Sequence, residues 1–302
     1  MPTAIQLKNA AILIPTRNRP AILKNTLAQL RMKVKGLGTL PLWVYDDASD
    51  DPSAISMAVK EIWPDAHLIL GGKRVGQAEG RNVLLRACQT KFAIMLDDDQ
   101  YFLELGLLND HIVQHSRNPD RAIVQFQSIV KATGELAHPK EAGPRMVPSF
   151  MGGCVLVHAP SLLKAGGYRP FFLYGYEEPD LVMRLWGQGF HVWYDPSIVV
   201  EHNQWYSPEE RRDFREYDYL YARNGVLLAT MNSPLWLGLP VGLARSMRRA
   251  LYHKRNYGVK TAGLLQGVAM TFSHWRERTP LSWRQAAEFW RFARGGKPPG
   301  SC

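Results

Sequence analysis

The sequence has few cysteines and lacks the signatures of several enzyme classes. Cys88, Cys154 and Cys302 lie far apart and form no Cys-x-x-Cys pair. This argues against a disulfide framework and a zinc knuckle, and suits a reducing cytoplasm. No G-x-G-x-x-G follows the first predicted strand and no G-x-x-x-x-G-K-S/T occurs anywhere, which excludes a Rossmann oxidoreductase and a P-loop NTPase. Residues 1–8 lack the basic-then-apolar pattern of a signal peptide.

Long apolar runs and late acidic residues are also scarce. Residues 226–244 are largely apolar, but two prolines and an asparagine interrupt them, which argues against a membrane-spanning helix. Residues 219–302 carry 13 Lys and Arg against 2 Asp and Glu, whereas residues 1–218 carry 24 against 25. A neutral body with a basic tail indicates an anionic partner: nucleic acid, anionic lipid or an acidic acceptor. Because no nucleic-acid module signature occurs, we expect no nucleic-acid partner.

The rest of the sequence predicts a folded α/β protein. Its 302 residues are 46% hydrophobic and 21% charged, as in a folded domain with or without an appendage. Apolar runs and helical patterns alternate, which predicts βαβ units and a mainly parallel central sheet flanked by helices. The predicted strands are residues 10–14, 42–45, 67–70 and 92–96, and the predicted helices are residues 21–33, 53–63 and a third that carries Arg81.

Polar residues follow three of these strands. The strand at residues 92–96 ends in Asp97-Asp98-Asp99, the strand at 42–45 ends in Asp46-Asp47, and the first ends in Pro15-Thr16-Arg17-Asn18. Parallel strands place these ends at one edge of the sheet, where they could converge on a ligand. Adjacent carboxylates repel one another unless a cation or strong donors neutralise them, and Mg²⁺ or Mn²⁺ commonly bridges carboxylates to phosphates. The alternative is a solvated acidic turn after a core strand.

These strand ends resemble those of family-2 glycosyltransferases of GT-A fold, of the type that builds bacterial surface saccharides. The resemblance covers about residues 10–205 and follows the family's motif order. Its segments are residues 14–18 (IPTRN), 46–49 (DDAS), 75–82 (VGQAEGRN), 96–99 (LDDD), 150–157 (FMGGCVLV), 163–168 (LKAGGY), 175–181 (GYEEPDL) and 199–202 (VVEH). We therefore expect a GT-A catalytic domain at residues 1–218, with a nucleotide-sugar half at about 1–100 and an acceptor half at about 101–218. A basic amphipathic helical extension follows at residues 219–302.

The resemblance implies transfer of a sugar from a nucleotide diphosphate sugar to an acceptor hydroxyl, with inversion at the anomeric centre. A divalent metal, Mn²⁺ or Mg²⁺, would stabilise the diphosphate leaving group. Asp99 is the expected metal ligand, with Asp97 next and His202 third, and Glu201 could replace His202. Asp97 could instead face the ribose. Asp98 is placed among the nucleotide-sugar contacts, with an exposed or supporting position as the alternative.

A general base must take the proton of the acceptor hydroxyl. The motif match places Glu178 at the family's base position, where Asp is usual. Because the side chain is one methylene longer, the choice between Glu177 and Glu178 stays open. Asp180 is expected to order the loop or to accept a donor at the N-terminus of the helix that follows it.

For the nucleotide, the resemblance places Asp47 at the base, where a carboxylate can accept from a ring N–H. Pro15, Thr16 and Arg17 would flank the base and ribose. Arg81 would meet the diphosphate or stack near the base, with an ordinary helix-surface arginine as the alternative. UDP and dTDP are favoured equally, and GDP stays open.

Aromatic residues and the basic tail suggest further contacts. Trp186 has helical spacing from its apolar neighbours and is expected in the core, whereas Trp205 and Tyr206 could stack on a sugar. Basic residues alternate with apolar ones after residue 244, which predicts an amphipathic helix on an anionic membrane surface, or a helix packed on the catalytic domain with a solvated basic face. The Arg223-Asn224 pair, in a helix predicted at residues 217–230, resembles a feature of bacterial relatives.

We therefore expect a cytoplasmic enzyme, peripheral on the inner face of the cell membrane, that uses a saccharide or lipid-linked acceptor in surface-polysaccharide synthesis. Three alternatives remain: a sugar-1-phosphate nucleotidyltransferase, a phosphotransferase with an aspartyl nucleophile, and a non-catalytic nucleotide-sugar-binding relative. The first two lack their signatures near the first strand. The donor sugar, the acceptor and the oligomeric state leave no signature in the sequence.

Overall fold

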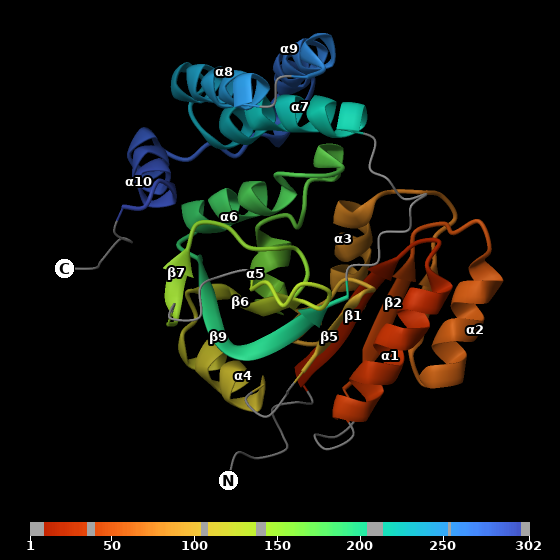
Figure 1. Cartoon of the computed structure of the whole chain (residues 1–302). Helices are drawn as coiled ribbons and strands as arrows, with labels where there is room; N and C mark the ends of the chain where they lie inside the picture. The colour runs from red at the N-terminus through yellow and green to blue at the C-terminus, as the bar shows by residue number, and fades with distance from the viewer. Residues whose placement is uncertain are drawn as a thin grey trace. The chain divides into compact units, whose positions relative to one another are not determined.

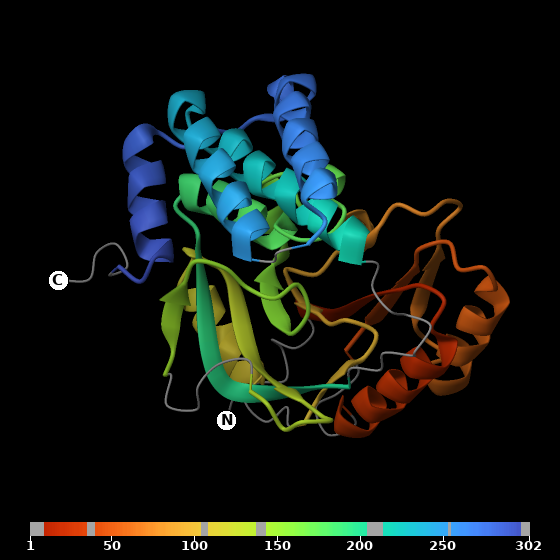
Figure 2. The same cartoon turned by 45° about the horizontal axis from the view of Figure 1, so that its top comes forward.

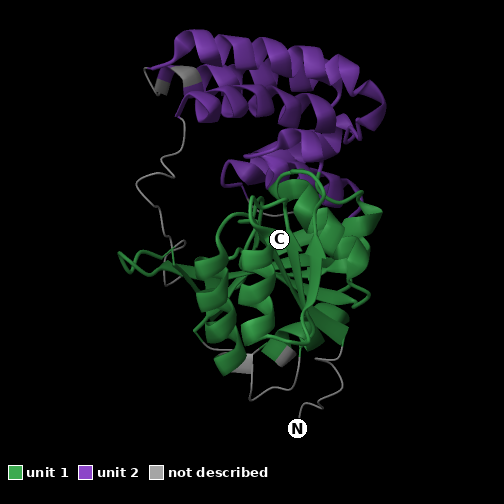
Figure 3. Cartoon of the chain, turned by 90° about the vertical axis from the view of Figure 1, so that its right-hand side faces the viewer, with its two compact units in different colours: residues 1–168, 190–205 green, residues 169–189, 206–302 purple. Residues whose placement is uncertain are grey.

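The computed structural model describes residues 9–34, 40–103, 108–136, 143–203, 214–252 and 255–296. The chain forms two compact units (Figure 3). Unit 1 comprises residues 1–168 and 190–205, and unit 2 comprises residues 169–189 and 206–302. The domains predicted from the sequence, residues 1–218 and 219–302, stay a prediction.

Unit 1 is built on a mixed sheet with strand order β3-β2-β1-β4-β8-β6-β9-β5, and β7 pairs with β9. The strands are β1 Ala10–Thr16, β2 Leu42–Asp46, β3 His67–Leu70, β4 Phe92–Met95, β5 Gln100–Phe102, β6 Arg121–Val130, β7 Arg145–Val147, β8 Val155–His158 and β9 His191–His202. Strands β1 to β4 pair in parallel, as predicted. Beyond them β8 pairs antiparallel with β4 and β6, and β5 and β7 pair antiparallel with β9, whereas β6 and β9 pair in parallel. The sheet is therefore mixed, and the mainly parallel arrangement expected from the sequence holds for β1 to β4.

Helices supply the crossovers between the parallel strands. They are α1 Pro20–Val34, α2 Pro52–Ile62 and α3 Gln77–Ala87, with α4 Leu108–Arg117 and α5 Ala159–Lys164 further along unit 1. Helix α1 packs beside α2, and α3 packs on β1 and β2 (Figures 1 and 2). Every residue of β1 and β4 is buried. This burial explains why both strands are uninterrupted apolar runs in the sequence. The expected α/β fold with a central sheet and flanking helices is confirmed.

The register of the sheet brings the polar ends of β1, β2, β4 and β9 to one edge. Thr16 at the end of β1 lies opposite Asp46 at the end of β2, and the acidic turn follows β4 on the other side of β1. In the β5–β9 pair, Gln100 lies opposite His202. The backbone N–H of Asn203 also donates to the carbonyl of Asp99 at 2.8 Å. The late histidine therefore reaches the acidic turn through a direct strand pairing.

Unit 2 is helical. It contains α6 Glu177–Gly187, α7 Phe214–Asn232, α8 Leu235–Tyr252, α9 Tyr257–Ser273 and α10 Trp283–Ala293, with 3₁₀ turns at Pro170–Phe172 and Trp275–Glu277. Helix α7 packs against both α8 and α9 (Figures 1 and 2). The helix predicted at residues 217–230 lies within α7, and the apolar stretch at 226–244 is divided between α7 and α8. Across the described ranges, no helix combines the length and apolarity needed to cross a bilayer.

Small residues set the contacts of α7 with its neighbours. A Cβ on Gly238 of α8 would lie 2.5 Å from the carbonyl oxygen of Ala229, and one on Gly267 of α9 would lie 2.6 Å from that of Arg223. Two further glycines, Gly242 and Gly263, approach α7 in the same way. Larger side chains at these positions would push the helices apart, so the glycines fix how closely α8 and α9 approach α7.

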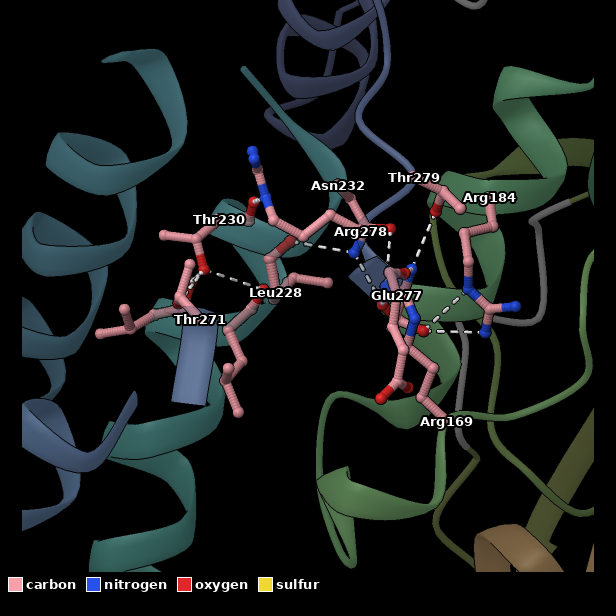
Figure 4. A network of polar contacts seen from close by, with 12 residues as sticks. Arg169, Arg184, Leu228, Thr230, Asn232, Thr271, Glu277, Arg278 and Thr279 are labelled. Atoms are coloured by element: carbon pink, nitrogen blue, oxygen red, sulfur yellow. Dashed lines mark hydrogen bonds and ion pairs between the residues drawn. The ribbon is translucent and has the colours of Figure 1, made fainter. Parts of the chain in front are cut away.

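A buried polar network joins α6 to the rest of unit 2 (Figure 4). Asp180 is fully buried and accepts from Arg169 at 2.6 Å, from Arg184 at 2.8 and 3.0 Å, and from Asn232 at 2.7 Å. Arg169 also donates to Thr279 Oγ1 at 2.9 Å. Burial opposes ionisation of Asp180, but its two arginines outweigh burial and lower its pKa below the ordinary value. The side chain expected to order this loop therefore does so through ion pairs.

Candidate active site

The acidic turn after β4 is neutralised by the loop after β1. Asp98 is buried and accepts from Thr16 Oγ1 at 2.7 Å and from Arg19 Nη1 at 2.5 Å. Arg19 Nη2 also donates to Asp99 Oδ2 at 3.0 Å, so one guanidinium bridges two carboxylates. Burial raises the pKa of Asp98 to about 7, against the opposing effect of Arg19. Repulsion within the turn is thus relieved by an arginine and by partial protonation.

Asp99 also contacts the late histidine. His202 Nε2 lies 3.2 Å from Asp99 Oδ1. Burial disfavours the charged form of both groups, but their mutual attraction outweighs it, lowering the pKa of Asp99 and raising that of His202. Oδ1 of Asp99 is buried and makes no hydrogen bond within the described part of the chain. The pair presents a carboxylate oxygen and an imidazole nitrogen side by side.

Asp97 has different neighbours. Its Oδ1 accepts from Gln77 Nε2 and from Arg81 Nη2, both at 2.9 Å, and its backbone N–H donates to Gln100 Oε1 at 3.1 Å. Arg81 is almost fully buried and lies over the ring of Tyr168 at 5.6 Å. It is therefore not the surface arginine that the sequence left as an alternative. The structure thus pairs Asp97 with Arg81, whereas Asp99 contacts His202.

The Gly-rich segment at residues 150–157 lies against these side chains. A Cβ on Gly152 would collide with the guanidinium of Arg81. One on Gly153 would collide with Gln100 Oε1 and lie 2.8 Å from Asp97 Oδ2. Both positions therefore need glycine, because the backbone passes directly over the polar groups at the end of β4.

The structure gives the predicted nucleotide contacts local partners. Both oxygens of Asp47 accept backbone N–H groups, from Val75 at 2.7 Å and from Gly76 at 2.9 Å. This fixes the loop that starts α3, and the remaining lone pairs can still accept from a base. Pro15 and Thr16 are buried at the end of β1, and Arg17 Nη2 lies 3.7 Å from Asp50.

The Asp99–His202 pair is suited to a divalent metal. A carboxylate oxygen and an imidazole nitrogen are ligands that Mn²⁺ accepts, and diphosphate oxygens and water could fill the other positions. Among the described residues, no group of three or more His, Cys, Asp and Glu side chains is arranged to hold a metal. The protein therefore offers a pair, and the assignment of Asp97 as a ligand stays a prediction. Glu201 is engaged by Tyr101 and by Lys131, which is 3.4 Å away, so His202 is the better-placed neighbour of Asp99.

The candidate bases lie in unit 2 at the start of α6. Glu177 is buried and Glu178 is half-buried. The preceding loop holds three residues with positive φ, which are Leu173 at 60°, Gly175 at 79° and Tyr176 at 73°. This conformation is strained for residues other than glycine, so it persists only where contacts with the surrounding structure stabilise it.

Helix α7 supplies what holds this loop. Asn224 Nδ2 donates to the carbonyls of Phe172, Tyr174 and Gly175 at 2.7 to 3.0 Å. Arg223 Nη2 donates to the carbonyl of Phe172 at 2.9 Å and to that of Phe171 at 2.7 Å. The Arg-Asn pair noted in the sequence thus shapes the segment that leads to both candidate bases.

Several residues of this site were not predicted from the sequence. Arg19, Gln77 and Gln100 contact the acidic turn but were not predicted as site residues. The need to neutralise three carboxylates, together with a second arginine in the loop after β1, was the available signal for Arg19. Trp186 packs against Phe289 and Phe292, which confirms its place in the core. The predicted sugar platform of Trp205 and Tyr206 lies outside the described residues.

A mixed sheet that brings an Asp-rich strand end next to a late histidine has the architecture of a GT-A glycosyltransferase. Among solved structures, the chain is similar to GalNAc-T7 with UDP, GalNAc and Mn²⁺, with TM-score 0.64 and 13% identity over 94% of this chain and 57% of that one. It is also similar to the mannosyltransferase PcManGT from Pyrobaculum calidifontis in complex with GDP-Man and Mn²⁺, with TM-score 0.53 and 17% identity over 95% of this chain and 86% of that one.

The sequence model of glycosyl transferase family 2 matches residues 11–166, just over half of the chain. The chain belongs to glycosyl transferase family 2 and is a glycosyltransferase. A comparison with curated proteins gave no match. The chain spans 57% of the length of the GalNAc-T7 chain.

Proposed function

We propose that the protein is a metal-dependent, inverting glycosyltransferase that moves a sugar from a nucleotide diphosphate sugar to an acceptor hydroxyl. The contact between Asp99 and His202 at the end of β4 carries this proposal, because a carboxylate oxygen and an imidazole nitrogen that could both bind a metal lie together where a parallel sheet edge would receive a diphosphate. UDP and dTDP remain the favoured donors on the position of Asp47. Of the two similar structures, one contains UDP and the other GDP-Man.

Each group has a chemical role in this reaction. Asp99 and His202 would hold the metal, which supplies positive charge to the leaving diphosphate. Arg81, buried beside Asp97, adds a fixed cation near the same strand end. Arg19 keeps Asp98 and Asp99 in place.

The acceptor oxygen attacks the anomeric carbon as the bond from that carbon to the diphosphate oxygen breaks. The proton of the acceptor hydroxyl passes to a carboxylate, for which we propose Glu178, with Glu177 as the alternative. Attack from the face opposite the leaving group inverts the anomeric centre. The held loop at residues 173–176 supports this role, because it fixes the backbone that leads to both glutamates.

We further propose that the enzyme works at an anionic membrane surface, in the synthesis of surface polysaccharide. The outward faces of α8 and α9 are apolar: Trp236, Met247 and Leu251 of α8, and Leu265 and Phe272 of α9, are each more than half exposed. On both helices the residues that approach α7 most closely are glycines: Gly238 and Gly242 on α8, and Gly263 and Gly267 on α9. Helices of a soluble protein normally show the reverse, with large apolar side chains inside.

This arrangement favours a helix pair lying in the headgroup region, with the exposed Arg276 near anionic lipids. Co-sedimentation with phosphatidylglycerol vesicles tests it. Trp236→Ser with Phe272→Ser should weaken binding, whereas Met57→Ser, an equally exposed change in unit 1, should not. Equal binding by all variants would contradict the membrane proposal.

Calorimetric titration of UDP, dTDP and GDP, each with Mn²⁺, Mg²⁺ or EDTA, tests the catalytic proposal. One nucleotide should bind tightly with metal, and Asp99→Ala should abolish that requirement together with most of the affinity. Asp65→Asn, an exposed change, is the matched control. Metal-independent binding would remove Asp99 and His202 from the metal site. Nucleotide binding without turnover on any acceptor would indicate a non-catalytic relative.

A further inference from the structure

Two arginines of α8 lie on aromatic rings near the loop at residues 173–176, which leads to the candidate bases. The guanidinium of Arg245 lies 5.0 Å from the ring centre of Tyr176 and 5.4 Å from that of Trp290. The guanidinium of Arg249 lies 3.7 Å from the ring centre of Tyr221. Both arginines are half-buried, and they stand one helical turn apart on one face of α8.

This pair lacks the oxygen partners that the other buried or half-buried arginines of unit 2 have within its described part. Within the described residues of this unit, no carboxylate pairs with Arg245 or Arg249. The other buried or half-buried arginines of the unit bind oxygen: Arg169 and Arg184 bind Asp180, and Arg223 and Arg278 bind backbone carbonyls. Two partly buried like charges at this spacing repel one another, so the site is complementary to an added anion.

Hydroxyl groups stand beside the arginines. Tyr217 Oη donates to Tyr174 Oη at 3.1 Å and lies 3.3 Å from Tyr221 Oη, and the rings of Tyr217 and Tyr221 stack at 4.7 Å. Burial, with the neighbouring hydroxyls, raises the pKa of Tyr221, so its phenol stays protonated. Guanidinium and phenol donors together suit the oxygens of a phosphate.

An apolar groove continues from the arginines along α8. It has a volume of about 530 Å³. Its lining residues are Leu237, Val241, Ala287, Trp290, Arg291, Arg294, Gly295 and Gly296. Val241 and Leu237 precede Arg245 by one and two turns on the same row of the helix, and Trp290 contacts both the groove and Arg245. Nε1 of Trp290 is buried and has no hydrogen-bond partner among the described residues, which leaves a donor at the junction.

We propose that the arginine pair and this groove bind a lipid carrying a phosphate or diphosphate, which serves as the carrier of the acceptor. The anionic group would lie between Arg245 and Arg249, and the hydrocarbon would lie along Leu237 and Val241. The inference rests on the proposed function, because Tyr176 directly precedes the candidate bases, and it narrows the acceptor to a lipid-linked one.

The test measures binding of geranylgeranyl diphosphate in non-ionic detergent micelles to the full chain, with saturating nucleotide and Mn²⁺ to occupy the donor site. Geranylgeraniol and inorganic pyrophosphate serve as probes of each half of the ligand. Arg245→Gln with Arg249→Gln should weaken binding by about tenfold or more. The matched control Arg248→Gln, an exposed arginine on the same helix, should stay within about twofold. Thermal melting checks folding, and the single change Arg249→Lys replaces the double variant if that variant does not fold.

Each outcome decides the inference. Tighter binding of the diphosphate lipid than of either probe, lost in the double variant and kept in the control, supports it. Equal loss with Arg248→Gln would show diffuse attraction, and pyrophosphate binding as tightly as the lipid would show a free-phosphate site; both overturn it. Absence of lipid binding while nucleotide binding persists overturns the inference alone, whereas absence of nucleotide binding overturns the proposed function.

Discussion

Replacement of Asp98 by asparagine should stabilise the metal-free protein at high pH and have little effect at low pH. Asp98 is buried and sits between Thr16 and Arg19. An amide of nearly the same shape can keep a hydrogen bond to Thr16, because a hydroxyl both donates and accepts. The change therefore removes mainly the carboxylate charge, and its effect on stability should follow the ionisation of Asp98.

The sign and size follow from the pKa of Asp98. Its ordinary value of 3.8 rises to about 7 in the folded protein because burial disfavours the carboxylate. Between these values the unfolded chain binds fewer protons at this site than the folded one, so the contribution of Asp98 to stability falls as pH rises. Below pH 3.8 the cost is absent, and above pH 7 it is complete. A shift of this size corresponds to about 4 kcal/mol.

Urea unfolding in EDTA at pH 4.5, 6 and 8 measures this cost. The free energy of unfolding of Asp98→Asn minus that of the wild type should increase steadily from pH 4.5 to pH 8, toward about 4 kcal/mol. Asp65→Asn, which changes an exposed carboxylate, should give a flat difference. A difference for Asp98→Asn that is also flat, or that decreases with pH, would refute the claim that burial in the folded protein disfavours the charged form of Asp98.

Three further changes test other parts of the structure. Arg184→Met leaves Asp180 buried with one fewer cation and should lower the free energy of unfolding by about 3 kcal/mol in urea titrations; an unchanged value would contradict the buried network. Gly153→Ala should reduce nucleotide affinity at least about tenfold in calorimetry, whereas Gly72→Ala, which meets open space, should not. Asn224→Ala should lower kcat about tenfold or more, because the loop before the candidate bases loses three hydrogen bonds; a change in nucleotide affinity alone would argue against this positioning role.

The nucleotide half of the fold could be predicted because its strands β1, β2 and β4 are almost completely buried, and the partly exposed β3 is still a short apolar run. The runs at residues 10–14, 42–45, 67–70 and 92–96 became β1 to β4 with ends shifted by two residues or fewer. A strand with no solvent-facing side must be continuously apolar, so its limits are visible in composition alone. The helices between these strands could be predicted as well, because apolar runs that alternate with helical patterns indicate βαβ units.

Contacts made by long polar side chains could not be predicted in this way. Arg17 and Arg19 are equivalent in the sequence, yet Arg19 bridges Asp98 and Asp99 while Arg17 lies near Asp50. Which arginine turns inward depends on the path of the loop after β1. The same holds for Asn224, whose three carbonyl acceptors are about 50 residues away in sequence.

The sequence pattern of helix α8 predicted an amphipathic helix but did not determine which of its sides is exposed. Alternating basic and apolar residues predicted an amphipathic helix with its basic side toward an anionic surface. In the structure Arg245 and Arg249 lie on tyrosine rings within unit 2, while Met247 and Leu251 are exposed. The glycines decide this, because only the Gly238–Gly242 side can approach α7 closely.

The candidate roles are divided between the two units in a way that mutations can separate. Unit 1 contains the Asp99–His202 pair proposed to bind the metal, together with Arg81 and the Gly-rich segment. Unit 2 contains the candidate bases and the arginine pair of α8. Changes at Asp99 should therefore act on nucleotide binding, and changes at Glu178 or Arg245 should leave it intact while reducing turnover or acceptor binding. If Glu178→Gln abolished nucleotide binding as fully as Asp99→Ala, the assignment of a base in unit 2 and a donor site in unit 1 would be wrong.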